Sequence, residues 1–94
     1  MTKTDGSVDE LAKILLKFKG KGELLSFLQD LCTPSELSSL AERWRVARLL
    51  ETGLSYREIN LATGVSTATV TRVARSLSLG TGYRQALEVT TKLD

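Results

Sequence analysis

The chain has no histidine and only one cysteine and one proline among its 94 residues. Without histidine, it lacks the usual general base of enzymes and the centre of a catalytic triad, so we do not expect an enzyme. A single cysteine cannot build a disulfide framework, and zinc sites of the usual cysteine and histidine ligands are excluded as well. We therefore expect no metal and no other required cofactor.

Long apolar runs are also absent. No stretch approaches the ~20 residues of a membrane span, and the N-terminal sequence MTKTDGSVDE lacks the apolar segment of a secretory signal. Hydrophobic residues make up 41% of the chain and charged residues 26%, as in an ordinary globular protein. We expect a single cytoplasmic domain, small enough that a partner subunit would usefully enlarge its core.

The sequence does contain a series of helix start and stop signals. Ser7, Thr33, Ser55 and Ser66 each precede a helical pattern, and the first three are followed three residues later by a glutamate, as in a capping box. Glycines separate the patterns, and no alternating run long enough for a confident strand occurs. We predict an all-α chain of about six helices. They begin near residues 7, 24, 34, 56, 67 and 83, and the last four end near residues 52, 63, 78 and 91.

The stretch ATGVSTATVTR, residues 62–72, predicts a helix-turn-helix. Gly64 can supply a positive φ in the turn, and Ile59, Val65 and Val70 are spaced to form the small core of the motif. The second helix carries compact polar residues, which suit a DNA major groove about 12 Å wide. Thr hydroxyls can bond base edges, and a methyl group can contact thymine. The candidate base-reading residues are Asn60, Ser66, Thr67, Ala68 and Thr71, with Asn60 at a position that is often alanine in this motif.

Positive charge is concentrated around this motif. The whole chain has a net charge of +2, whereas residues 57–84 carry four arginines against one glutamate, a net +3. A local excess of this kind favours nucleic acid or another anionic partner, although an ordinary solvated face would also account for it. Arg57, Arg72 and Arg75 are candidates for contacts with phosphates or guanine edges.

Taken together, several motifs resemble the tryptophan repressor family over roughly residues 31–79. These motifs are LCTPSE (31–36), ERWR (42–45), LLETGLSYREI (49–59), GVSTATVTR (64–72) and Ser76-Leu77. The following LGTGY looks like the YerC/YecD subfamily. The resemblance implies an intertwined homodimer with two recognition helices about one DNA turn apart, acting as a transcriptional regulator and most often as a repressor.

The resemblance also suggests how the chain is divided. The apolar segments LLKF and LLSFLQDL then form the dimer core, since exposed apolar surface of this kind marks an interface. The alternative is that they bury each other within one subunit. The expected division of the single domain is residues 1–32 for dimerisation, 33–79 for the DNA-binding core and 80–94 for a C-terminal helix.

The resemblance further implies a candidate effector pocket for L-tryptophan. Arg43 and Arg72 fall on the positions that flank the indole, and Thr33 and Ser76 fall on positions near the amino-acid head group. Val73, however, stands where tryptophan-binding members have glycine, and its side chain would fill the slot. We therefore expect double-stranded DNA and a second copy as partners, with either no effector or an effector other than tryptophan. Two alternatives stay open: a tryptophan-dependent repressor, and a helix-turn-helix protein-interaction module without sequence-specific DNA binding.

Overall fold

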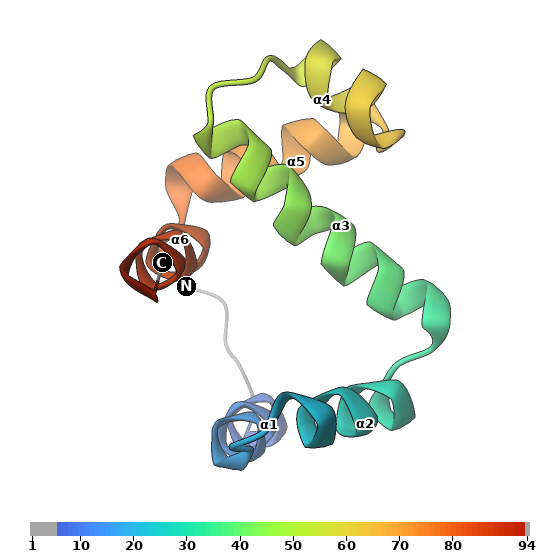
Figure 1. Cartoon of the computed structure of the whole chain (residues 1–94), viewed down its shortest axis with the longest axis vertical. Helices are drawn as coiled ribbons and strands as arrows, with labels where there is room; N and C mark the ends of the chain where they lie inside the picture. The colour runs from blue at the N-terminus through green and yellow to red at the C-terminus, as the bar shows by residue number, and fades with distance from the viewer. Residues whose placement is uncertain (1–5, 94) are drawn as a thin grey trace. The chain divides into compact units, whose positions relative to one another are not determined.

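A computed structural model describes residues 6–93, without the side chains of residues 92 and 93. Within this range the chain forms six α-helices and no strand, which confirms the predicted all-α fold (Figure 1). The helices are α1 (Gly6–Lys17), α2 (Lys21–Leu31), α3 (Pro34–Glu51), α4 (Tyr56–Thr63), α5 (Thr67–Leu79) and α6 (Gly82–Leu93). None of the helices in the described range is long and apolar enough to cross a membrane.

Side-chain caps fix where three of the helices begin. Before α3, the Thr33 hydroxyl accepts from the Glu36 amide (3.1 Å) and the Glu36 carboxylate accepts from the Thr33 amide (2.8 Å). Ser55 and Glu58 make the same reciprocal pair before α4, at 3.1 Å and 2.9 Å. Ser66 caps α5 with its hydroxyl. These three predicted caps are confirmed, and each satisfies amides that have no partner inside the helix.

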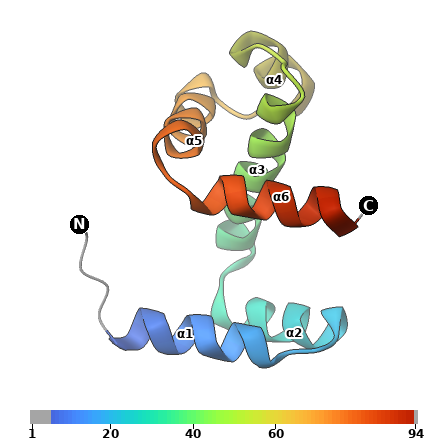
Figure 2. The same cartoon turned by 90° about the vertical axis from the view of Figure 1, so that its left-hand side faces the viewer.

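The first of two compact units comprises α1, α2 and the start of α3, up to residue 37. A short turn joins α1 to α2 (Figure 2). The rings of Phe18 and Phe27 lie 5.3 Å apart between their centroids, yet no residue of α1 or α2 is buried. The predicted cap at Ser7 is wrong, because α1 already includes Gly6 and Ser7 lies inside its first turn.

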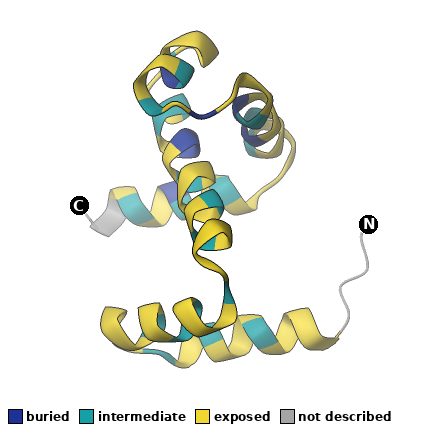
Figure 3. Cartoon of the chain, turned by 90° about the vertical axis from the view of Figure 1, so that its right-hand side faces the viewer, coloured by how far each residue is buried: buried dark blue, intermediate teal, exposed yellow. Residues whose placement is uncertain are grey.

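The second unit begins at residue 38 and holds the rest of α3 with α4, α5 and α6. Its largest group of buried residues lies on α3, α4, α5 and the turn between α4 and α5 (Figure 3). Leu87 on α6 is also buried, at 8% exposure. The core consists of Val46, Ala47, Ile59, Val65, Val70 and Val73, and Trp44 and Tyr83 are among the half-buried residues packed against it. The three apolar positions predicted for the helix-turn-helix are therefore all confirmed as core. α5 contacts both α4 and α6.

Candidate nucleic-acid interface

The interface is built on the tight turn between α4 and α5. Gly64 has φ 76° and ψ −1°, the left-handed conformation that was predicted for it, and its amide donates to the Asn60 carbonyl at 2.8 Å. A side chain at this position would be strained, so glycine allows α4 to stop abruptly. Ile59 and Val65 are buried on either side of the turn at 0% and 5% exposure. These residues place α5 directly after α4 as the second helix of a helix-turn-helix.

Two side chains of α4 also bind the backbone of the turn. The Thr63 hydroxyl donates to the Ile59 carbonyl (2.7 Å) and accepts from the Val65 amide (3.0 Å). The amide group of Asn60 donates to the Val65 carbonyl (2.8 Å). Sequence reasoning missed both roles. It interpreted Asn60 as a base contact, and the structure adds a contact inside the turn.

The start of α5 presents a surface of small side chains. Thr67, Ala68 and Thr71 are all exposed, as is the cap residue Ser66. The Thr71 hydroxyl donates to the Thr67 carbonyl at 2.8 Å, which fixes the side chain and leaves its lone pairs free to accept. The Ser66 hydroxyl accepts from the Thr69 amide (3.2 Å) and donates to the Thr69 hydroxyl (3.1 Å). A face without bulk can approach a base pair closely.

Three arginines of α4 and α5 have no ion pair within the described part of the chain. Arg57 on α4 and Arg72 and Arg75 on α5 are exposed. The ion pairs among the described side chains are Lys13 with Asp9 and Arg84 with Glu51. The three guanidinium groups therefore have no carboxylate partner and remain available for an anion.

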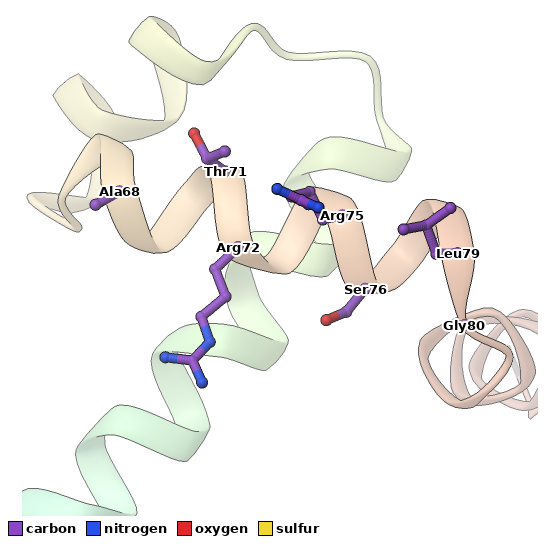
Figure 4. Close-up of a pocket in the computed structure, with 7 residues that line it drawn as sticks. All are labelled: Ala68, Thr71, Arg72, Arg75, Ser76, Leu79 and Gly80. Atoms are coloured by element: carbon purple, nitrogen blue, oxygen red, sulfur yellow. The ribbon is translucent and has the colours of Figure 1, made fainter. Parts of the chain in front are cut away.

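The two arginines of α5 line an open groove along that helix (Figure 4). In this view, the Arg72 and Ser76 side chains extend from one side of α5, and Thr71 extends from the other. The other residues that line the groove are Ala68, Leu79 and Gly80.

The one acidic residue in this region is already engaged. Hydrogen bonds from the backbone and side chain of Ser55 lower the pKa of Glu58 below its usual range. The carboxylate is therefore ionised at neutral pH. Its negative charge stabilises α4, because it lies near the positive N-terminal end of the helix dipole. Among the described residues, no group of three or more cysteine and acidic side chains is placed to hold a metal ion.

Comparison with known proteins identifies the fold and the family. A family model described as "Trp repressor protein" matches residues 6–91. The chain belongs to the Trp repressor family. This confirms the resemblance seen in the sequence motifs.

Individual relatives agree with this assignment. The "Uncharacterized protein YerC" of Bacillus subtilis is 44% identical over 82 residues, which cover 86% of this chain and 79% of that protein. A crystal structure of a TrpR-like protein from Eubacterium eligens has a TM-score of 0.87 and 37% identity, and the match covers 94% of this chain and 92% of the other. A proposed Trp repressor from Staphylococcus aureus also gives a TM-score of 0.87, with 36% identity and coverage of 94% and 89%.

The residues expected in the effector pocket of this Trp repressor family member have different surroundings. Arg43 on α3 is exposed, and Arg72 and Ser76 both line the groove along α5. Thr33 belongs to the first unit, where its hydroxyl caps α3. Val73 is only 2% exposed and packs into the core of the second unit. Its isopropyl group is thus a core side chain.

Proposed function

We propose that the chain is a sequence-specific double-stranded DNA-binding transcriptional regulator that acts as a homodimer, with α5 in the major groove. One observation carries this proposal: α4, its tight turn and α5 present a compact polar face beside three unpaired arginines. Family membership supports the same function. The similar structure from Staphylococcus aureus is described as a proposed Trp repressor, which favours repression. We propose that the regulator acts in the cytoplasm.

The contacts divide into two kinds. Arg57, Arg72 and Arg75 hold phosphates, helped by backbone amides at the helix N-termini, and these contacts set position without reading sequence. Base pairs are read by the small side chains on the first turns of α5. The proposed readers are Ser66, Thr67, Ala68 and Thr71.

The homodimer is supported by the first unit. Leu16 is 85% exposed, Leu25 45% and Leu31 49%, and neither helix that carries them has a buried residue. Surface of this kind needs cover in water. We propose that a second copy supplies it, with residues 1–32 forming the dimer core, residues 33–79 binding DNA and residues 80–94 adding a C-terminal helix.

We propose that DNA binding does not require L-tryptophan. The burial of Val73 supports this, because its side chain packs in the core where a ligand ring would otherwise need space. A tryptophan-dependent repressor would instead use the groups at Thr33, Arg43, Arg72 and Ser76. The guanidinium groups of Arg43 and Arg72 can bind a carboxylate and stack on an aromatic ring. The experiment below therefore tests this alternative together with the main proposal.

The test is selection of genomic DNA fragments by the purified protein, with and without L-tryptophan. Recovery of a pseudo-palindromic site without the amino acid is the expected result, since a two-fold symmetric dimer binds two half-sites. Recovery only with tryptophan would overturn the claim of independence. Recovery of no specific sequence in either condition would point to a protein-interaction module instead.

Replacement of Thr71 tests the reading face. We expect Thr71→Ala to lose about 1–3 kcal/mol of discrimination at one base pair of each half-site. Thr91→Ala is the matched control, because the Thr91 hydroxyl makes the same kind of bond, to the Leu87 carbonyl at 2.9 Å, on α6. Binding to a panel of single-base variants of the selected site measures both. An unchanged base preference in Thr71→Ala would mean that the reading face is assigned incorrectly.

A further inference from the structure

Both backbone polar groups of Val65, the central residue of the turn, are hydrogen-bonded to side chains. Its amide donates to the Thr63 hydroxyl at 3.0 Å, and its carbonyl accepts from the Asn60 side chain at 2.8 Å. Neither group has a hydrogen bond to another backbone group. Both polar groups of this peptide segment are therefore satisfied by side chains of α4.

The surroundings make these two hydrogen bonds important. Val65 is 5% exposed, and Asn60 and Thr63 are themselves partly buried. A carbonyl or amide that loses its partner in such a place recovers little from water. The backbone conformation of Val65 also sets the direction in which the chain continues into Ser66 and α5.

We propose that Asn60 is a positioning residue which, together with Thr63, fixes the direction of α5 before DNA arrives. This inference rests on the DNA-binding function proposed above. It assigns Asn60 a contact with the turn in place of the base contact that its sequence position suggested. The reading face is then held ready by side chains of the chain itself.

A small change in direction has a large effect at the reading face. Thr71 follows Val65 by six positions, which corresponds to about 9 Å along a helix. A rotation of α5 by about 10° at Val65 would move Thr71 by roughly 1.6 Å. A shift of this size exceeds the tolerance of a hydrogen bond to a base edge. The two contacts of the turn are therefore suited to control affinity without touching DNA.

The experiment uses Asn60→Leu, which keeps a similar volume and removes the donor. We expect the affinity of this variant for the selected DNA site to fall about tenfold for each of the two α4–α5 turns in the dimer. A tenfold change is the usual effect of one lost buried hydrogen bond on an equilibrium constant. The loss should be similar for every single-base variant of the site, and the dependence on salt should not change. Leu61→Ala is the control, because Leu61 is the next residue of α4 and is 74% exposed.

Thr63 provides a second variant. Thr63→Val keeps the branched shape and removes the hydroxyl, so it should also weaken binding. Because Asn60 and Thr63 bond the same residue, the double variant should lose less than the product of the two single losses. Fully independent effects would contradict a shared role.

A measurement without DNA separates positioning from general destabilisation. Hydrogen exchange followed by NMR on the free protein should show faster exchange at the amides of Val65 and Thr69 in Asn60→Leu. The amides at the centres of α3 and α6 should exchange at wild-type rates. Faster exchange throughout the second unit would show that Asn60 only stabilises the fold, and would overturn the proposal.

The outcomes distinguish this inference from the function on which it rests. If the wild-type chain selects no DNA sequence, the proposed function fails and the inference fails with it. If the wild type binds a specific site and Asn60→Leu binds that site equally well, the inference alone fails. A loss confined to one base pair, with wild-type exchange in the turn, would restore Asn60 as a base-reading residue.

Discussion

Val73 offers the most direct test of how α5 is supported. The side chain is 2% exposed and belongs to the core cluster formed with residues of α3 and α4. Val73→Ala removes most of this buried side chain without disturbing the helix, since alanine is a strong helix former. Val73→Gly removes the rest of it and adds a flexible backbone position in the middle of α5.

The expected losses follow from these contacts. Truncation to alanine removes about two buried carbon groups at about 0.8 kcal/mol each, and the residual cavity adds a further term, so the total is about 2 kcal/mol. Glycine adds about 1 kcal/mol because of its low helix propensity, for a total of about 3 kcal/mol. For a chain of this length, each kcal/mol lowers Tm by about 4–8 °C. Val73→Ala should therefore melt about 8–16 °C below the wild type.

Urea unfolding and thermal melting at a fixed protein concentration measure both variants. Ser78→Ala, on the exposed surface of α5, is the control and should change the free energy of unfolding by less than about 0.5 kcal/mol. If Val73→Ala also costs less than about 0.5 kcal/mol, Val73 is not a core residue, and the reason for tryptophan independence is lost.

The wild-type protein tests the same reasoning with a ligand. A ligand present at about 100 times its Kd stabilises a protein by about 2.7 kcal/mol, which would raise Tm here by at least about 10 °C. We expect millimolar L-tryptophan to leave the wild-type Tm unchanged, because the Val73 side chain occupies the interior. A clear increase would refute the proposal that this residue fills the pocket.

Three further predictions concern charge, packing and pH. Arg57→Ala should weaken binding evenly across DNA sequences and should reduce the slope of log K against log salt by about 1 for each Arg57 in the dimer. Arg84→Ala is the control. It removes a charge that is already paired with Glu51, so it should leave the slope unchanged. Gly80→Ala should lower the free energy of unfolding, measured with urea, by about 1–3 kcal/mol, because a Cβ there would lie 2.9 Å from the Ser76 carbonyl oxygen. Gly82→Ala is the control, because a Cβ at that position would meet nothing within 4 Å. Equal stabilities of the two variants would contradict the argument. Because the pKa of Glu58 is lowered in the folded chain, its cap stabilises the fold above pH 4.5, the ordinary glutamate value, and this contribution is lost as pH falls through the lowered pKa. The stability difference between wild type and Glu58→Gln should thus shrink in acid, and a difference that is equal at pH 3 and pH 7 would count against it.

Local signals predicted most of the fold. Thr33, Ser55 and Ser66 were identified as caps because a short polar side chain before a helical pattern has few other structural roles. Gly64 was assigned a positive φ because the two flanking patterns left room only for a tight turn. The prediction that Ser7 is a cap is wrong because a local signal fixes a helix start only to within a residue or two.

The candidate site was predicted less completely. The exposed faces of Thr67 and Thr71 follow from helical periodicity, which the sequence contains directly. The role of Asn60 in the turn does not, because it depends on the distance between a side chain and a carbonyl five residues away. Likewise, the sequence shows four arginines within residues 57–84, but only the structure shows that Arg84 is paired with Glu51.

The absence of buried residues in α1 and α2 has a consequence for how the protein matures. Helices of 12 and 11 residues are only marginally stable alone in water. In the proposed dimer, their ordering and the encounter of two chains become one bimolecular event. The yield of DNA-binding protein then rises with the square of the concentration of new chains at low expression. A gene controlled by this protein would thus respond to its synthesis more steeply than in proportion.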